Sequence, residues 1–309
     1  MNFIKKIHGH WIYSPNMLFF LLWSFLEIKR LFKIGFTENC KNCSKESIDV
    51  IIPTTAKDYG LLPYVIRSLK NVCQPINKIF IISDDNQIIT DLCKKNGCNF
   101  IDEKKVLGYG KEKIAYRDAF STDRSGWLFQ QLLKLSGDTI VEKENYLVLD
   151  SDTVLINKHN FIKNEKFIFS QDAGYNKAYF NAFNFIFKRI APNKLMTTCH
   201  MMIFNKKKLK EMKTEMENIH ARRWDEIIIA TKNLDKNESS CHSEYDTYPN
   251  WLLMRHPSAV EQKPFYNRGL AKAELLSNQN ISASLDNLKI KYGNKYNSIS
   301  FHSYLKSNR

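Results

Sequence analysis

The sequence predicts an α/β protein whose mixed, mostly parallel sheet is flanked by helices. From residue 48 onward, short apolar runs rich in Ile, Val and Phe alternate with segments of helical spacing. Polar residues follow several of these runs, at the points where strands would end. Strands and helices that alternate in this way build parallel sheets covered by helices. The chain has 309 residues, enough for one large α/β domain with appendages or for two small domains.

The first half of the chain shows this alternation most clearly. A buried strand is expected at 48–52, where it meets Pro53, and a helix follows at 61–72. A second strand at 78–83 stops at the acidic pair Asp84-Asp85. The next elements expected are a helix at 86–96, a strand at 98–101, a loop with a short helix at 108–124, a helix at 126–135 and a strand at 146–156.

The second half is less regular. Apolar runs predict strands at 167–169 and 200–204, and the aromatic stretch 171–191 is expected to be a loop. Asn205 is expected to cap a basic helix that runs to residue 220. Two more helices are expected at 222–232 and 243–254, and Pro249 complicates the second of them.

The first 47 residues differ from the rest and are expected to form a basic, aromatic helical segment. Residues 17–26 are an apolar decamer, and Lys29, Arg30 and Lys33 follow it. The decamer is too short to span a bilayer, which needs about 20 apolar residues. A helix of this composition suits the membrane interface, and we expect peripheral contact with an anionic membrane. The alternative is a helix that packs on the main domain.

Charge and cysteine content narrow the class of protein. The net charge of +14 suits nucleic acid, anionic lipid or phosphorylated substrates. The sequence shows no zinc-finger array, recognition-helix pattern or RNA-binding aromatic signature, so no nucleic-acid partner is expected. Seven irregularly spaced cysteines and no cleavable signal favour a reduced, cytoplasmic protein. Cys40 and Cys43 form a lone CxxC without the second pair that a zinc ribbon needs.

The triplet Asp150-Ser151-Asp152 is the most informative feature of the chain. It interrupts the apolar run 146–156, and in a strand both carboxylates would point to one face. Two anions so placed repel each other unless a cation lies between them. Mg²⁺ and Mn²⁺ prefer oxygen ligands and share them with phosphates. The alternative interpretation is an acidic turn between two strands.

Four motifs follow one another in the chain: the Pro-Thr-Thr loop after the first strand, the Ser-Asp-Asp end of the second, the helix 127–135 and Asp-Ser-Asp. Together they resemble the glycosyltransferases of the GT-A type, whose DxD motif binds a divalent metal and a nucleotide-sugar diphosphate. Segments 127–135, 200–204 and 243–248 resemble bacterial surface-polysaccharide (lipopolysaccharide or capsule) glycosyltransferases. The resemblance implies a Rossmann-like GT-A fold. It divides the catalytic domain 48–309 into a nucleotide-binding half, 48–156, and an acceptor half with a closing segment, 157–309.

The resemblance also implies roles for individual residues. The nucleoside would lie on the loop after the first strand and on the acidic pair after the second, and Asp150 would face the ribose and sugar. Asp150 and Asp152 would hold Mn²⁺ or Mg²⁺ together with His302. The diphosphate would lie near cations of the loop before the DxD helix. The nucleotide-binding set is Pro53, Thr54, Thr55, Asp58, Asp84, Asp85, Asp150, Arg117 and Arg124, with Lys111 as a further cation.

The reaction implied is transfer of a sugar from a nucleotide donor, expected to be a UDP-sugar, to a glycan or lipid-linked glycan. The protein would then work at the inner face of the cytoplasmic membrane. Transfer that inverts the anomeric carbon needs a base at the acceptor hydroxyl. Glu244 is the first candidate, with His200 and Asp172 as rivals. A retaining enzyme would need no such base, and Glu244 would then cap a helix after Ser243.

Two other functions compete with this one. A sugar-phosphate nucleotidyltransferase would share the topology, but its Gly-rich phosphate loop is replaced here by a loop with one glycine, Gly60. A non-catalytic, membrane-associated nucleotide-sugar-binding protein would have a degenerate site, and the intact pair Asp150 and Asp152 argues against it.

Overall fold

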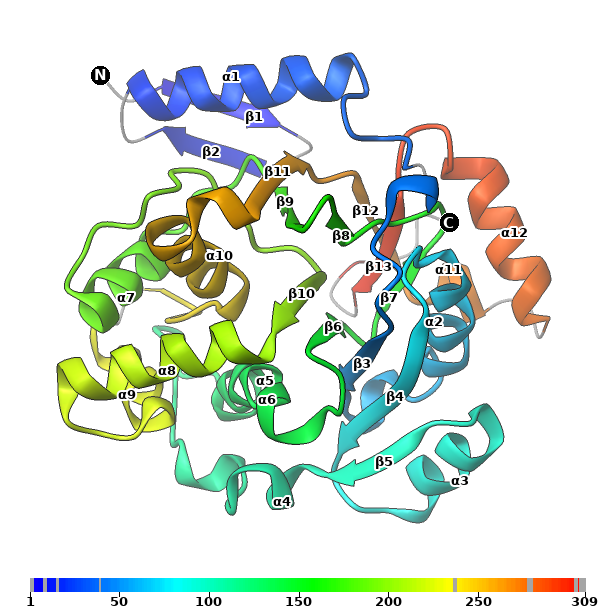
Figure 1. The fold of residues 1–309 in the computed structure, drawn as a ribbon, viewed down its shortest axis with the longest axis horizontal. Coiled ribbons are helices and arrows are strands. Elements are labelled where there is room, and N and C mark those ends of the chain that lie inside the picture. The colour runs from blue at the N-terminus through cyan, green and yellow to red at the C-terminus, as the bar shows by residue number, and fades with distance from the viewer. Residues whose placement is uncertain are drawn as a thin grey trace.

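The computed structural model describes residues 3–7, 10–14, 17–38, 40–235, 238–276, 280–302 and 305. A central five-stranded sheet has the strand order β10-β6-β3-β4-β5 (Figure 1). Four strands are parallel, and β10 alone runs antiparallel to its neighbour β6. This confirms the predicted mixed, mostly parallel α/β fold. The strands are β3 (Ile48–Pro53), β4 (Ile76–Ser83), β5 (Asn99–Asp102), β6 (Asn145–Leu149) and β10 (Met201–Asn205).

The strand order contains a switch point between β3 and β6. From β3 the chain proceeds outward to β4 and β5, and then returns to place β6 on the other side of β3. Loops that leave β3 and β6 at their carboxyl ends therefore diverge, and ligands bind in such crevices in open α/β sheets. All six residues of β3 are buried, as expected of a central strand covered on both faces.

Helices cover the central sheet and surround its edges (Figure 1). Helix α5 lies against β3, and α10 packs on α5. Local capping signals set several helix ends: Asn86 caps α3, and Asn205 accepts from the Lys208 backbone N–H at the start of α8. The α-helices after residue 47 are α2 (Leu62–Ser68), α3 (Gln87–Asn96), α4 (Glu103–Leu107), α5 (Ser125–Leu135), α6 (Gly137–Ile140), α7 (Lys177–Phe187), α8 (Lys206–His220), α9 (Trp224–Ala230), α10 (Glu244–Arg255), α11 (Ala273–Leu276) and α12 (Ile281–Tyr292).

Two three-stranded sheets flank the central sheet. One has the order β11-β9-β8 and the other β12-β13-β7. In the second, β13 pairs with β7, so the C-terminal strand lies beside the chain that leaves β6. The strands are β7 (Thr153–Leu155), β8 (Ile162–Lys163), β9 (Lys166–Gln171), β11 (Val260–Pro264), β12 (Asn267–Ala271) and β13 (Ser298–His302).

The N-terminal segment forms a hairpin and a helix that lie on one side of the main domain (Figure 1). Strands β1 (Phe3–Ile7) and β2 (His10–Ser14) pair antiparallel, and helix α1 (Met17–Leu31) follows. One face of α1 is buried against the domain through Phe19, Trp23 and Leu26. The described part of the chain contains no helix with the length and apolar character needed to cross a bilayer.

The structure corrects the prediction for 171–191, which was expected to be a loop. This stretch contains α7, capped by Asn176, whose side chain accepts from the Ala178 backbone N–H. Phe183, Ile186 and Phe187 are buried on its inner face. Their spacing of three and four residues is the helical period, which the high aromatic content obscured.

Pro249, which was expected to complicate this helix, lies inside α10 without ending it. Proline has no N–H, so the Tyr245 carbonyl one turn earlier lacks its usual helical partner. The Thr197 hydroxyl donates to that carbonyl at 2.8 Å instead. The helix therefore continues to Arg255 with the carbonyl satisfied from outside.

The run 146–156 is not one strand. It forms β6 and β7, which belong to different sheets, and Asp150-Ser151-Asp152 is the turn between them. The alternative interpretation, an acidic turn between two strands, is thus the correct one for the backbone. The two carboxylates nevertheless lie close to each other, because the turn redirects the chain at that point.

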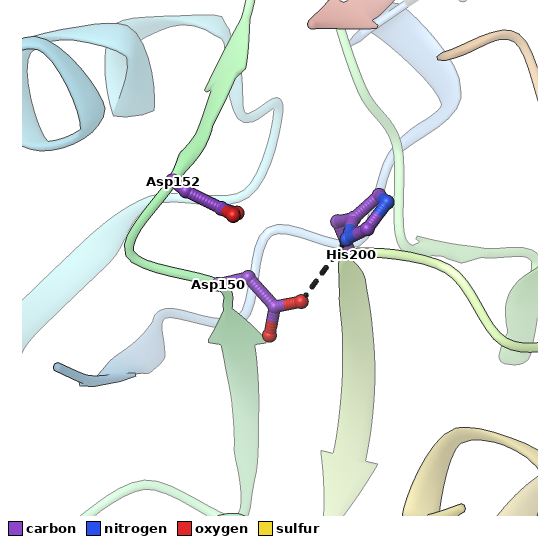
Figure 2. Close-up of side chains that lie close together, drawn as sticks. All are labelled: Asp150, Asp152 and His200. Carbon is purple, nitrogen blue, oxygen red and sulfur yellow. Dashed lines mark hydrogen bonds and ion pairs between the residues drawn. The ribbon is translucent and has the colours of Figure 1, made fainter. Parts of the chain in front are cut away.

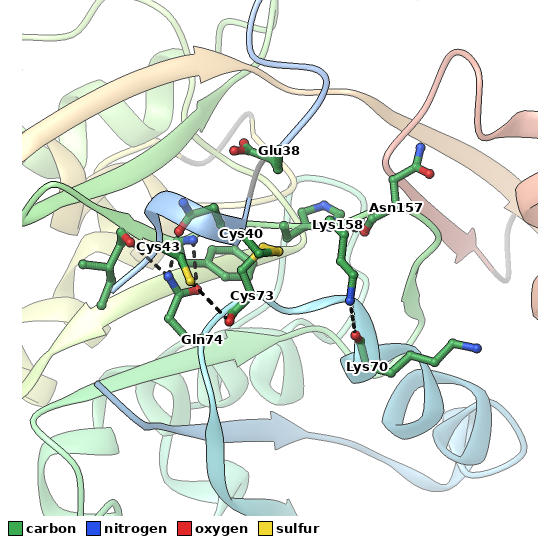
Figure 3. Close-up of a disulfide and its surroundings, with 12 residues drawn as sticks. Glu38, Cys40, Cys43, Lys70, Cys73, Gln74, Asn157 and Lys158 are labelled. Carbon is green, nitrogen blue, oxygen red and sulfur yellow. Dashed lines mark hydrogen bonds between the residues drawn. A yellow bond between two sulfur atoms is a disulfide. The ribbon is translucent and has the colours of Figure 1, made fainter. Parts of the chain in front are cut away.

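The expectation that all cysteines are reduced is wrong for two of them. Cys40 and Cys73 form a disulfide, with Cα atoms 5.1 Å apart (Figure 3). The other five cysteines are free, and the Cys43 thiol donates to the Cys73 carbonyl at 3.5 Å. The CxxC is therefore not a paired unit. Its first cysteine bonds to a turn 33 residues away, a pairing that spacing alone does not reveal.

Candidate active site

The acidic turn lies at the carboxyl end of β6, next to the residue that precedes β10. The Asp150 backbone N–H donates to the His200 carbonyl at 2.9 Å, which extends the β6–β10 pairing by one residue. One Asp150 carboxylate oxygen lies 3.1 Å from His200 Nδ1 (Figure 2). Asp150, Asp152 and His200 each offer a ligand atom, and these atoms lie within 4.8 Å of one another.

Strand β13 brings His302 to the same place. The Phe301 backbone N–H donates to the Asp152 carbonyl at 2.8 Å. His302 Nδ1 consequently lies 3.8 Å from an Asp152 carboxylate oxygen, and the His200 and His302 rings have centroids 5.3 Å apart. Two carboxylates and two imidazoles from three parts of the chain therefore converge. The predicted role of His302 as a metal ligand stays a prediction.

A buried lysine on α5, Lys134, contacts the Asp150 carboxylate. Lys134 Nζ is 2.7 Å from one Asp150 carboxylate oxygen and 2.8 Å from Glu244 Oε1. The Tyr245 hydroxyl donates to the same Asp150 oxygen at 2.9 Å, and Lys134 Nζ lies 4.3 Å from the centre of the Tyr245 ring. The side chains of Lys134 and Glu244 are only 4% and 1% exposed. One cation thus links the acidic turn to the start of α10.

The two carboxylates of the turn have opposite electrostatic environments. Burial raises the pKa of Asp150, but the positive charge of Lys134 and the hydrogen bond from His200 outweigh it and hold the pKa well below its usual value. Burial and the charge of Asp150 raise the pKa of Asp152 to about 6. Asp150 is therefore already balanced by protein groups, whereas Asp152 has no such partner cation among the described ion pairs at hydrogen-bond distance.

This donor set fits a divalent cation. Among the described hydrogen bonds, the Asp152 carboxylate accepts from the Thr153 hydroxyl at 3.2 Å and keeps further acceptor capacity. Burial and the nearby His200 lower the pKa of His302 to about 4, which keeps its imidazole neutral and able to coordinate. Carboxylates with imidazole suit Mn²⁺ and related ions. Asp150, Asp152 and His200 offer ligand atoms close enough together to hold such an ion, and the His302 ring lies beside them.

The loop after β3 also reaches this edge of the sheet. Ser151 Oγ donates to an Asp58 carboxylate oxygen at 3.1 Å, which bridges the switch point between β3 and β6. Lys272 forms an ion pair with the other Asp58 oxygen, and it also donates to the Lys57 carbonyl at 2.9 Å. Of the loop residues predicted to bind the nucleoside, Pro53, Thr54 and Asp58 are buried and Thr55 is exposed.

The two residues of the acidic pair after β4, Asp84 and Asp85, differ in their hydrogen bonds. Asp84 accepts hydrogen bonds from the Tyr59 hydroxyl at 2.9 Å and from Ser83 at 3.0 Å. Although burial opposes the effect, these bonds and one from Asn86 lower the pKa of Asp84. Asp85 is exposed, with no such network among the described contacts. Tyr59 links the β3 loop to the end of β4, so the two predicted nucleoside-binding segments lie side by side.

The cations predicted for the diphosphate have their described contacts elsewhere. Arg117 donates to the Ser121 carbonyl at 2.7 Å within its own loop. The Arg124 guanidinium lies over the Trp127 ring, 4.8 Å from its centre. Lys111 begins the short 3₁₀ helix Lys111–Lys113. Their proposed role at the diphosphate stays a prediction.

The three predicted bases occupy different places. Glu244 is buried against Lys134, where burial raises its pKa against the effect of that lysine. Asp172 accepts from Arg30 of α1 at 2.9 Å. His200 alone lies at the acidic turn itself. The structure thus brings His200 to the candidate site and shows the other two facing cations of the protein.

Sequence reasoning missed Lys134, Tyr245 and Lys272. Lys134 sits among apolar residues of a helix whose neighbours Leu132, Leu133 and Leu135 are all buried. A lysine inside such an apolar stretch is a signal, because a buried ammonium requires an anionic partner. Tyr245 and Lys272 carried no comparable local signal.

Several solved structures of glycosyltransferases are distantly similar to this chain. Mouse xyloside xylosyltransferase 1 is 12% identical with a TM-score of 0.42, over 84% of this chain and 98% of that one. The galactosyltransferase LgtC, in complex with donor and acceptor sugar analogues, is 10% identical with a TM-score of 0.45, over 84% and 88%. The glycosyltransferase GlyE of Streptococcus pneumoniae is 11% identical with a TM-score of 0.38, over 84% and 55%. Likeness this distant says nothing of substrate or reaction.

No curated protein matches the sequence. One family model does, and its match covers residues 45–286, from just before β3 into α12. It includes the acidic turn, Lys134, His200 and Glu244, but ends before His302. Because this match spans well over half of the 309 residues, the chain belongs to the family of unknown function DUF6492.

Proposed function

We propose that this protein is a metal-dependent glycosyltransferase of the GT-A type that uses a nucleotide-sugar donor, with UDP as the nucleotide. The observation that carries the proposal is the convergence of Asp150, Asp152, His200 and His302 at the carboxyl edge of the central sheet. Two partly exposed carboxylates beside two imidazoles suit a cation and a bound diphosphate together. This edge is also the switch point of the sheet, where nucleotides bind in open α/β folds.

In this proposal Asp152 and His302 hold Mn²⁺ or Mg²⁺. The ion would supply positive charge to the departing nucleoside diphosphate. Asp150 is held in place by Lys134, Tyr245 and His200, so its role is to shape the site and to face the ribose and sugar. Lys57, which is exposed, and Lys272 lie near Asp58 and add positive charge on the diphosphate side.

The nucleoside is assigned to the loop after β3 and to the end of β4. Asp84 is the residue of this region with an organised hydrogen-bond network, through Tyr59 and Ser83. A carboxylate whose pKa is held low stays an acceptor for ribose or uracil donors at neutral pH. Asp58 supports the loop through Ser151 and Lys272.

For the acceptor, the proposal is inverting transfer with His200 as the base. Its Nδ1 is hydrogen-bonded to Asp150, which leaves Nε2 as the second ring nitrogen. Burial lowers the pKa of His200, but the hydrogen bond and charge of Asp150 raise it overall, which favours proton acceptance. The acceptor would be a glycan or lipid-linked glycan of bacterial surface-polysaccharide synthesis, made in the cytoplasm at the membrane. The support for this pathway is the sequence resemblance of 127–135, 200–204 and 243–248.

The proposal is tested by calorimetry of UDP binding with Mn²⁺ and with chelator. We expect the full chain to bind UDP only when Mn²⁺ is present. Asp152→Asn should weaken this binding by tenfold or more, about 1.4 kcal/mol, because it removes an anionic ligand. Asp286→Asn is the matched control, since Asp286 is an exposed acid on α12. Equal UDP affinity with and without Mn²⁺, or an Asp152→Asn variant that binds as well as the control, would refute the proposal.

A further inference from the structure

Helix α1 exposes an apolar face although its other face is buried. Eight of the fifteen large apolar side chains exposed among the described residues fall between residues 17 and 34. Isolated exposed apolar residues are ordinary, but a continuous stripe marks an interaction surface. This α1 apolar face consists of Met17, Leu18, Leu21, Phe25, Ile28, Leu31, Phe32 and Ile34, which are 50–79% exposed.

The opposite face of α1 already packs on the main domain. The helix therefore cannot turn to bury the α1 apolar face in the core of the domain. Phe19, Trp23 and Leu26 pack in one cluster with Ala173 and Leu195 of the main domain.

Polar contacts fix the C-terminal end of the helix as well. Arg30 pairs with Asp172 at 2.9 Å. The Tyr266 hydroxyl donates to the Ile34 carbonyl at 2.9 Å, just beyond the last turn of α1. Outward and inward positions alternate with the helical period, as in a helix that lies between two partners.

The charges around the α1 apolar face indicate which partner covers it. Lys29 Nζ lies over the Phe25 ring, 4.6 Å from its centre, and Lys33 Nζ lies over Phe36 at 5.5 Å. The acid of α1, Glu27, is paired with Arg30 at 2.6 Å. The rim of the face is therefore basic, on a chain of net charge +14. A second copy would place two such basic rims together, whereas an anionic lipid surface complements them.

We propose that the α1 apolar face docks α1 in the plane of an anionic lipid bilayer. At about 1.5 Å per residue the helix is only some 22 Å long, so it lies in the interface and does not cross the bilayer. Leu21, Phe25 and Ile28 enter the acyl boundary, and Lys29 and Lys33 contact anionic headgroups.

Docking also sets the position of the candidate site relative to the membrane. Tyr266 holds the end of α1, and the adjacent Phe265 ring lies 6.1 Å from the His200 ring, between centroids. A short, folded connection thus joins the docked helix to the acidic turn. A site held at the lipid surface suits an acceptor carried by a lipid. This last point rests on the proposed function, whereas the docking of α1 is independent of it.

The test is cosedimentation of the full chain with vesicles of phosphatidylcholine alone or mixed with phosphatidylglycerol. The wild type should bind the anionic vesicles, and binding should fall as salt is raised. Leu21→Glu/Phe25→Glu should bind about tenfold or more weakly, because two apolar side chains leave the acyl boundary. Ile290→Glu is the matched control, since Ile290 is 82% exposed on α12 and should bind as the wild type.

A second pair of variants tests the basic rim without touching apolar residues. Lys29→Glu/Lys33→Glu should lose about tenfold or more on anionic vesicles, whereas Lys94→Glu/Lys95→Glu on α3 should not. Wild-type protein that stays in solution with anionic vesicles would overturn the proposal. So would a wild-type dimer that Leu21→Glu/Phe25→Glu converts to monomer, since a second copy would then cover the face. UDP calorimetry on the same variants should be unchanged, which separates docking from the proposed function.

Discussion

Lys134 is the residue on which the interior of the candidate site depends. It is the cation shared by Glu244, which is buried, and Asp150, which is partly exposed. Buried ion pairs contribute little net stability compared with apolar side chains of similar size. Removal of the lysine, however, leaves the charges of two carboxylates without a cation. Lys134 therefore allows Asp150 and Glu244 to lie close together, and it fixes the orientation of the Asp150 side chain.

Lys134→Met keeps the length of the side chain and removes the charge. We expect the free energy of unfolding to fall by about 3–5 kcal/mol, because the buried carboxylate of Glu244 and the partly exposed carboxylate of Asp150 lose their cation. Urea unfolding followed by tryptophan fluorescence measures this loss.

The double variant Lys134→Met/Glu244→Gln provides the control. It should recover part of the lost stability, since one of the uncompensated charges is then absent, and the coupling energy follows from the mutant cycle. A single variant within 1 kcal/mol of the wild type, at the scale of a surface ion pair, would contradict the interpretation of Lys134 as a required cation.

At the scale of elements, the disulfide joins two connections that do not belong to one secondary structure. Cys40 starts the 3₁₀ helix Cys40–Asn42, which precedes β3, and Cys73 lies between the 3₁₀ helix Leu69–Asn71 and β4. The bond thus ties the end of the N-terminal segment to the entry of a central strand. It closes a loop with a sequence separation of 33 residues, which restricts the unfolded chain.

Reduction should therefore lower stability without changing the site. With dithiothreitol present, we expect the free energy of unfolding to fall by about 2–4 kcal/mol. Cys40→Ser/Cys73→Ser should show the lower value in both conditions and should not respond to the reductant. If wild-type protein unfolds at the same urea concentration with and without reductant, the cysteines are not paired in solution.

The elements themselves could be predicted wherever the signal is local. The apolar runs that became β3 and β4, and the Asn205 cap of α8, are complete within a few residues. The expected loop 171–191 failed because its aromatic content concealed a helical period. The continuous strand through Asp150 failed because the change of sheet depends on β13, which pairs with β7 from about 145 residues away.

In the candidate site too, residues with a local signal could be predicted, and contacts between distant parts of the chain could not. The acidic pair was visible because it interrupts an apolar run, and His302 was indicated by resemblance. Lys134 was not visible, because its meaning depends on Glu244 from a helix 110 residues later. Pairing of Cys40 with Cys73 likewise depends on how the chain returns, which spacing does not determine.

At the scale of the whole molecule, two histidines are buried in their neutral form. Burial, together with the charge of Lys263, lowers the pKa of His159 to about 3. Burial lowers the pKa of His242 to about 3 as well, and neither of its ring nitrogens has a hydrogen-bond partner within the described structure. The unfolded chain takes up protons on both near pH 6.5, whereas the folded protein does not.

The contribution of these two histidines to stability should consequently fall as the pH decreases. The folded pKa values are depressed, so this contribution is complete above about pH 6.5 and is lost progressively toward pH 3. Each histidine accounts for about 1.4 kcal/mol per pH unit within that window. Urea unfolding at a series of pH values from 7.5 downward measures the slope.

His242→Phe isolates one of the two contributions. Its stability should depend on pH less steeply than that of the wild type, by about 1.4 kcal/mol per pH unit below pH 6. Parallel curves for the two proteins would show that His242 is not buried neutral in the folded state.

The pairing of β13 with β7 has a consequence for how the protein is made. His302 lies beside Asp152 only when this late strand has joined the sheet. During translation, the acidic turn is synthesised 150 residues before His302, and the loops after β3 and β4 are synthesised earlier still. A growing chain can fold its central sheet while the second imidazole has yet to be made. A ligand that requires His302 therefore cannot bind a nascent chain before residue 302 has left the ribosome.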